Sequence, residues 1–260
     1  MNRWLTYLLS TPALLMIACF ALLPTLLLFR VSLYRPSTGR GFYVPDTFTL
    51  ENYLALADPA ELQIIFFTAC FGLTVASLVI IVGLPLALFV RSLPSRLQVI
   101  ALLLILIPKT AGLLATLFGL QRMLPRGTVA AIIGEVYLIL PYAVLVMYTQ
   151  QRTIRPELLS AAEGLGGTKW QIFRRVTLPL SFPGIVIAFE LGLIWGLAAF
   201  LGPLFLGGPM QTTLSVELHR QAFEYGRWPR AAAIAVCLLA QLSLAVFAIG
   251  RISRRQRGMK

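Results

Sequence analysis

Charged side chains are scarce in this chain, because Asp, Glu, Lys and Arg together make up only 12% of its 260 residues. A soluble domain of ordinary composition carries about 25% charged residues. This scarcity excludes a typical water-soluble globular protein. Hydrophobic residues make up 58% of the chain instead, and the mean hydropathy is +0.83.

Residues that bind metals or form crosslinks are also few. The chain has one histidine, and its three cysteines, Cys19, Cys70 and Cys237, all lie within apolar runs. The sequence therefore shows no metal-ligand spacing and no disulfide framework. Nothing in it resembles an enzyme site, since one histidine and no acid pair in a polar pocket are available. We expect no catalytic residues and no bound metal.

The chain is rich in long apolar runs. A helix needs about 20 apolar residues to cross a bilayer, and these runs are continuous, unlike the short alternating segments of a transmembrane β-barrel. The first run is too long for the apolar part of a signal peptide, so we interpret it as a retained span. We predict an all-α polytopic membrane protein, a single transmembrane domain over residues 1–260. Its six spans would cover residues 8–29, 62–90, 97–120, 129–148, 184–206 and 231–250.

The net charge of +12 would indicate a nucleic-acid partner in a soluble protein. Here the basic residues lie mostly outside the apolar runs, where they set the orientation of the spans, and we predict no binding to nucleic acid. More of them fall on the side that holds the 149–180 loop and the basic C-terminal tail. Because cytoplasmic loops carry the excess of Lys and Arg, we predict that both termini are cytoplasmic.

Residues 149–180 form a basic loop between the fourth and fifth predicted spans. Pro156 suits the first turn of a helix, and Glu157 suits the positive end of the helix dipole. Gly166 and Gly167 would end this helix, because glycine tolerates the left-handed conformation of a helix stop. The first half of the loop is therefore predicted to be one short helix followed by a turn.

A second short helix is expected after the glycines. Trp170, Phe173 and Val176 would form its apolar stripe, Pro179 would stop it, and Pro183 would open the next span. The loop would then be a small helix–turn–helix at the membrane surface. Periodicity alone leaves a second interpretation open, an amphipathic interfacial helix that only anchors the loop.

The pattern Ala161-Ala162, Gly166 and Leu178-Pro179 resembles the "EAA" loop of ABC importer permeases. In that family the loop is the docking point for the ATPase. The resemblance implies an ATPase-coupling loop that includes Glu157, Ser160, Ala161, Ala162, Glu163, Gly166, Trp170, Phe173 and Pro179. The family usually has Glu immediately before the Ala pair, where this chain has Ser160. Glu157 and Glu163, one helical turn to either side, are candidates to replace that acid.

The resemblance extends over residues 62–250. The segments FLGPLFLGG at 200–208 and TLSVELHRQAFEYGRWPRAA at 213–232 are similar to permeases of the polyamine, opine, phosphonate and iron(III) group. The chain would thus be a lipid-embedded subunit of a type I ABC importer in the bacterial inner membrane. Its solute would be small and polar, of the polyamine, phosphonate, opine or iron type.

The same resemblance implies partners. Two ATP-binding subunits would dock on the loops, a periplasmic solute-binding protein would deliver the solute, and a second permease chain would complete the path. We favour a heterodimer of permeases, because the departure at Ser160 is easier to tolerate when the other subunit keeps the acid. ATP and Mg would bind the partner ATPase, since Lys169 is followed by Trp170 and the P-loop motif is not met. This chain would hold no cofactor.

Ionisable side chains inside spans are costly and usually face a partner or a polar cavity. Lys109 follows Pro108, where proline can break the third predicted span. Glu135 lies in the fourth, and Tyr142, seven residues on, shares its face. Two interpretations stay open: these side chains line a translocation path, or Lys109 pairs with Glu135 in a purely structural contact.

Glu190 lies in the fifth predicted span, beside a stripe of small residues that includes Gly192 and Gly196. Small stripes allow close helix packing, and Glu190 points about 200° away from Gly192. We predict a span that is buried on both sides, with Glu190 either lining the path or making a buried hydrogen bond in its protonated form. Two glutamates facing the path would suit a cationic solute.

A stand-alone secondary transporter or channel with a basic cytoplasmic loop is the alternative function. Such a protein has no reason to carry an EAA-type loop. Secondary transporters also tend to contain internal repeats, and no convincing repeat relates the first three predicted spans to the last three.

Overall fold

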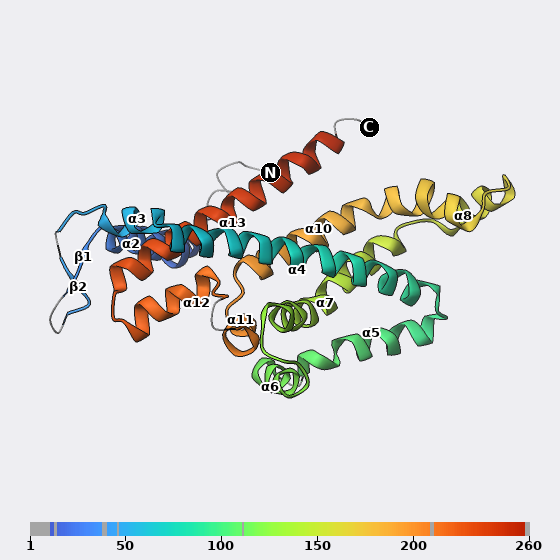
Figure 1. Ribbon diagram of the computed structural model, residues 1–260. Coiled ribbons are helices and arrows are strands. Elements are labelled where there is room, and N and C mark those ends of the chain that lie inside the picture. The colour runs from blue at the N-terminus through green and yellow to red at the C-terminus, as the bar shows by residue number, and fades with distance from the viewer. Residues whose placement is uncertain are drawn as a thin grey trace. The chain divides into compact units, whose positions relative to one another are not determined.

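Helices dominate the computed structural model, which describes residues 11–12, 15–37, 41–45, 47–110, 112–208 and 211–257, without the side chains of positions 108, 109 and 252–257 (Figure 1). Within these ranges the strands are the two-residue β1 (Arg35–Pro36) and β2 (Tyr43–Val44), which pair antiparallel. The prediction of an all-α polytopic protein is confirmed.

Five helical stretches of the described residues are long and apolar enough to cross a membrane. They are Leu15–Ser32, which contains the π-helical η1 (Ala18–Leu22) and α2 (Leu23–Ser32); α4 (Pro59–Ser92); α7 (Thr128–Arg152); Lys169–Leu197; and α13 (Trp228–Arg257) as far as Arg251. Four of the six predicted spans correspond to such helices with small changes of boundary. Residues 8–10 and 13–14 of the first predicted span lie outside the described residues.

The third predicted span is wrong as a single helix, because residues 97–120 form two helices. α5 (Ser95–Thr110) runs past Pro108, and α6 (Leu113–Met123) begins after a break. Gly112 is the N-cap residue of α6 and has φ +79°, a left-handed conformation that side chains other than glycine rarely adopt. The break therefore falls after α5 at a glycine and not at the proline.

The fifth predicted span begins earlier and ends earlier than expected. α9 (Lys169–Ile172), the π-helical η3 (Phe173–Thr177) and α10 (Leu178–Leu197) follow one another without interruption. Pro179 does not stop the second loop helix, because the wider π turn lies directly before it and the amide of Leu178 bonds to Phe173 O. Pro183 lies inside α10. The chain leaves the helix after Leu197 and resumes it in α11 (Leu201–Leu206).

The α-carbon contacts divide the chain into two compact units. The first gathers the described residues of 1–63 with 214–240. It contains α3 (Glu51–Leu54), η2 (Ala55–Ala57), α12 (Leu214–His219) and η4 (Arg220–Glu224), together with the starts of α4 and α13. The second holds 64–213 with 241–260 and contains α5 to α11. One permease domain over the whole chain stays a prediction.

Buried polar contacts organise the first unit. The side-chain amide of Asn52 in α3 donates to Ser32 O and Tyr34 O, at 2.9 Å each, and so binds the end of α2. Glu61 at the start of α4 and Arg230 at the start of α13 form a 2.6 Å ion pair in which the glutamate side chain is 8% exposed. These contacts hold the loops of this unit to the ends of the apolar helices.

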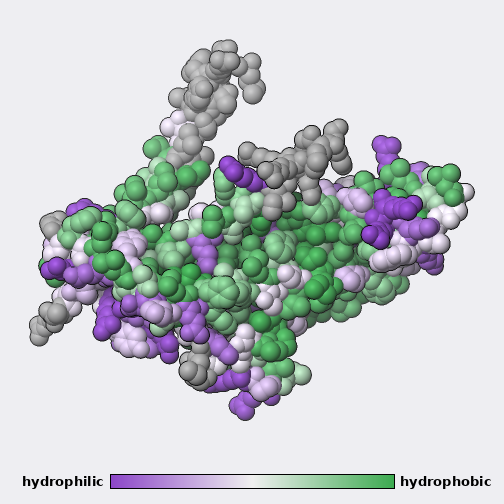
Figure 2. All heavy atoms as spheres, turned by 45° about the horizontal axis from the view of Figure 1, so that its top comes forward, coloured by the Kyte–Doolittle hydropathy of each residue, from purple (hydrophilic) through white to green (hydrophobic). Residues whose placement is uncertain are grey.

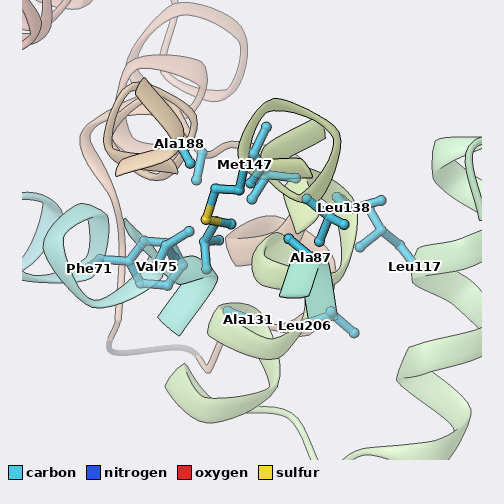
Figure 3. Close-up of a cluster of buried hydrophobic side chains, with 14 of the residues drawn as sticks. Phe71, Val75, Ala87, Leu117, Ala131, Leu138, Met147, Ala188 and Leu206 are labelled. Atoms are coloured by element: carbon cyan, nitrogen blue, oxygen red, sulfur yellow. The ribbon is translucent and has the colours of Figure 1, made fainter. Parts of the chain in front are cut away.

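Close packing of α4, α7 and α10 forms the core of the second unit. Met147 of α7 lies between Val75 of α4 and Ala188 of α10, and all three are buried (Figure 3). A Cβ atom added at Gly196 would lie 2.8 Å from Gly72 Cα. The predicted small-residue stripe of α10 therefore packs backbone to backbone against α4, as such stripes do in membranes.

Candidate functional site

The predicted first loop helix is present as α8 (Pro156–Gly164). Pro156 occupies its first turn and Glu157 is the acidic residue there, as expected. No residue of α8 is buried. This helix therefore has no core of its own.

The turn after α8 is a Schellman motif, in which two backbone bonds close the helix end. The amide of Gly167 donates to Ala162 O at 3.1 Å, and the amide of Gly166 donates to Glu163 O at 2.9 Å. Gly166 has φ +78°, which explains the glycine. At Gly167 a Cβ atom would lie 2.8 Å from Ala162 O, so the second glycine is required by close approach.

The next helix is started by a capping box. The Thr168 hydroxyl accepts from the amide of Gln171 at 3.3 Å, and the Gln171 side chain accepts from the amide of Thr168 at 2.9 Å. This T-x-x-Q pair is a helix-start pattern that the sequence carried and that we did not use. With it, both sides of the turn are fixed by local bonds, so the angle between α8 and α9 is built into the sequence.

The tip of the loop presents apolar side chains to solvent. Leu165 is 89% exposed and Trp170 is 67% exposed, with its ring stacked on Phe173 at 5.5 Å. The adjoining Ile172 is buried and anchors α9. In Figure 2 hydrophilic side chains gather around this end of the second unit, with apolar ones among them. Exposed apolar groups rimmed by polar residues are typical of a protein–protein contact.

The acids of α8 are all at the surface. Glu157 and Glu163 are exposed, and neither makes an ion pair or a hydrogen bond through its side chain within the described ranges. The Ser160 hydroxyl turns back to Pro156 O at 3.3 Å. Position 160 therefore offers a partner no negative charge, whereas the carboxylates one turn away on either side remain accessible.

Side-chain bonds tie the loop to the rest of the second unit. Arg91, at the end of α4, donates to Ile154 O at 3.1 Å, just before α8 begins. Gln98 of α5 donates to Arg91 O at 3.1 Å and accepts from the Tyr148 hydroxyl at 2.6 Å. The entry to the loop is thus bonded to the α4–α5 turn and to α7.

Glu135 is the buried carboxylate of α7, and it lies at a break between helices. It is 3% exposed and accepts from Trp195 Nε1 of α10 at 2.6 Å and from the amide of Gly202 in α11 at 3.1 Å. A cavity of about 410 Å³ adjoins it, lined otherwise by apolar residues. The lining residues are Leu113, Leu138, Ile139, Leu191, Ile194, Trp195, Ala198, Ala199, Phe200 and Leu201.

The other predicted path residues lie further along the same two helices. α7 and α10 are antiparallel, because Gly184 meets the side chain of Gln150 while Trp195 bonds to Glu135. By this register, Glu190 lies at the level of Tyr142. Both are partly exposed, Tyr142 to 45%. Glu190 is about 40° around α10 from the cavity-lining Ile194, so the cavity face of α10 extends toward it.

A known protein family matches most of the chain. Residues 69–258 match the family described as "Binding-protein-dependent transport system inner membrane component". The chain belongs to this family. It is thus an ABC importer permease, as the EAA-type loop implied, and a multi-pass protein of the inner membrane.

Similar proteins include a polyamine permease. The chain is 27% identical over 257 residues to the spermidine/putrescine transport system permease protein PotB of Salmonella typhimurium SL1344, a match that covers 90% of this permease and 89% of that one. A chain in the crystal structure of a bacterial ABC transporter that imports the acidic polysaccharide alginate shares the fold. It has a TM-score of 0.76 at 17% identity and covers 97% of this permease and 96% of that chain.

A second alginate transporter structure has the same fold. It was solved in complex with an alginate pentasaccharide-bound periplasmic protein, and its chain has a TM-score of 0.74 at 19% identity. The overlap covers 97% of the permease and 94% of that chain. At these identities the likeness establishes the architecture and leaves the solute open.

Two predicted features of the permease remain untested. The side chain of Lys109 lies outside the described residues, so its pairing with Glu135 stays a prediction. The roles of Glu135, Tyr142 and Glu190 in the translocation path also stay predictions. The sequence reasoning did not find Trp195 or Gly202, because nothing in local spacing links them to Glu135, 60 and 67 residues away.

Proposed function

We propose that this permease forms part of the translocation path of an ATP-driven importer for a small cationic solute of the polyamine kind. The observation that carries the coupling role is the loop at α8 and α9. Its turn is fixed by a Schellman motif and a capping box, whereas Leu165 and Trp170 at its tip have no core to cover them. A rigid surface element with exposed apolar groups suits docking of a rigid partner.

The partner would be an ATP-binding subunit, one on each permease, because this chain has no phosphate-binding loop. A second permease chain, a heterodimer partner in our proposal, would complete the path. A periplasmic binding protein would deliver the solute, as the alginate structure's complex with such a protein suggests. The basic loop and tail would then be cytoplasmic, with both termini on that side.

Two features support a cationic solute. The PotB relative is a spermidine/putrescine permease by name. In addition, the ionisable groups on the α7 and α10 faces described above, Glu135 and Glu190, are acidic. Acidic groups along a path favour a cation, and the apolar walls of the cavity suit methylene groups. Phosphonate, opine and iron-type solutes are the alternatives from the resembled group.

Co-purification tests the coupling role. Tagged permease extracted gently from its native host should carry an ATP-binding subunit and a second permease in stoichiometric amounts. Leu165→Asp should lose the ATP-binding subunit while keeping the second permease, because it places a charge on the exposed docking tip. Phe48→Asp is the matched control, since Phe48 is also exposed, at 75%, but lies far from the loop in the sequence.

A permease that purifies alone and transports without ATP in liposomes would contradict the proposal. That result would favour the stand-alone transporter.

A further inference from the structure

α11 is attached at both ends to α7. At its start the amide of Gly202 donates to Glu135, and at its end Leu206 O accepts from the amide of Gly127, the N-cap residue of α7, at 2.8 Å. Leu206 is fully buried, and a Cβ atom at Gly134 of α7 would lie 2.5 Å from it. α11 is therefore seated on α7, although it follows α10 in the chain.

α10 continues directly from the coupling loop, and it also packs against α4 and α7. The helix from Lys169 to Leu197 runs without interruption from the loop turn to the break. At about 1.5 Å per residue it is a rod roughly 40 Å long. At the break the backbone leaves the helical conformation, with Ala198 at ψ 4° and Phe200 at φ −121°. A displacement of the loop would therefore reach the break as movement of the rod.

One carboxylate of α7 bonds to the helices on both sides of the break, α10 and α11. Glu135 accepts from Trp195 on the rod and from Gly202 on α11. A Cβ atom at Gly202 would collide with Glu135 Oε1, so the glycine is there to let the carboxylate approach. We call this pair of bonds the lock, because it joins α10 and α11 across the helix break.

The cavity beside the lock gives the joint room to move. It is lined from the rod side by Leu191 and Ile194 and from the α11 side by Leu201. A close-packed interior resists displacement, because even small shifts create clashes. A cavity of about 410 Å³ at the break lowers that resistance on one side of the rod.

We propose that Glu135 is a positioning residue of the transport cycle, which keeps its bond to Gly202 and releases Trp195 when the rod moves. It holds the α10–α11 joint in the conformation described here. The inference rests on the proposed function, because the movement of the rod is driven by the docked ATPase. It assigns a role to Trp195 and Gly202 that neither the sequence pattern nor the relatives suggest.

Trp195→Phe tests the release. It keeps an aromatic ring in the cavity wall but removes the indole donor, so the rod should be freed. In the purified complex with its ATPase, we expect basal ATP hydrolysis to rise on the order of tenfold, the equivalent of one hydrogen bond. Trp228→Phe is the matched control, because Trp228 makes ring contacts with Phe42 and Phe223 in the first unit. Equal hydrolysis in Trp195→Phe and wild type would overturn the proposal.

Thermal melting of the permease tests the lock without any partner. In a Glu135→Ala background, Trp195→Phe should have no further effect. The double variant should therefore have the same melting temperature as the Glu135→Ala single variant. Gly202→Ala should lower the melting temperature, and Glu135→Ala should partly restore it by removing the collision. Gly119→Ala is the control, because a Cβ there has nothing within 4 Å.

Glu135→Ala is combined with Trp195→Phe in one double variant and with Gly202→Ala in the other. If the changes in melting temperature of the single variants simply add in both double variants, the lock is overturned, whether or not the ATPase co-purifies. Absence of the ATPase from wild-type preparations, with coupling in the melts intact, would overturn the proposed function and with it the driven release.

Discussion

At the residue scale, Gly166 tests whether the shape of the loop matters for coupling. Its φ of +78° is strained for any β-branched side chain. Gly166→Val should therefore leave the permease inserted, weaken retention of the ATPase and reduce transport. Gly164→Val is the control, because Gly164 is helical and a Cβ there meets nothing within 4 Å. Normal complex yield and transport in Gly166→Val would count against the loop assignment.

Gln151 makes a second prediction at this scale. It is completely buried near the end of α7, and neither polar atom of its side chain has a hydrogen-bond partner in the described part of the chain. An unsatisfied buried amide costs about 1–3 kcal/mol. Gln151→Leu should therefore raise the melting temperature of the permease. Gln150→Leu should not raise the melting temperature, because Gln150 donates to Leu180 O at 3.3 Å. If the two variants shift the melting temperature equally, or in the reverse order, the Gln151 amide has hydrogen-bond partners.

At the element scale, the Glu61–Arg230 ion pair joins the starts of α4 and α13. Its 2.6 Å separation and low exposure make loss of one partner costly, because the other charge stays buried. Arg230→Met should destabilise the first unit by roughly 1–3 kcal/mol. The double variant Glu61→Gln/Arg230→Met should recover part of this in thermal melts. A double variant that melts at the sum of the two single losses would show that the pair does not interact.

The elements themselves show where sequence reasoning holds and where it fails. Apolar run lengths located α4, α7 and α13, because burial in a bilayer depends mainly on composition. They failed at α5 and α6, where one run hides a glycine break, and at Pro179, where a π turn accommodates the proline. A helix break at one glycine and a single π turn each alter the backbone hydrogen bonds over a few residues. Neither changes the hydropathy of the run, so hydropathy does not reveal them.

At the scale of the whole molecule, the site divides into a predictable and an unpredictable half. The coupling loop depends on local patterns, since Pro156, Gly166 and the Thr168–Gln171 pair act within a few residues of each other. The cavity beside Glu135 depends on α7, α10 and α11 meeting in space, and a single sequence does not contain that information. Acidic residues in spans were found because their burial is costly, whereas their partners were not.

Glu190 gives the whole-molecule prediction for the path. Because it is partly exposed on the extension of the cavity face and makes no side-chain bond to the described residues, it is available to a solute or to the second permease. Glu190→Gln should reduce uptake while the complex assembles normally. Unchanged uptake would remove Glu190 from the path. Glu163→Gln removes the same charge in the docking loop and should weaken assembly with the ATPase instead. Comparison of the two variants separates a role in the path from a role in docking.

The most direct test is ATP-dependent uptake of radiolabelled putrescine by liposomes that hold the permease, its co-purified partners and the binding protein. The account predicts uptake only with ATP and the ATPase present, and loss of uptake in Gly166→Val. Uptake by the permease alone, driven by an ion gradient and insensitive to ATP, would contradict it.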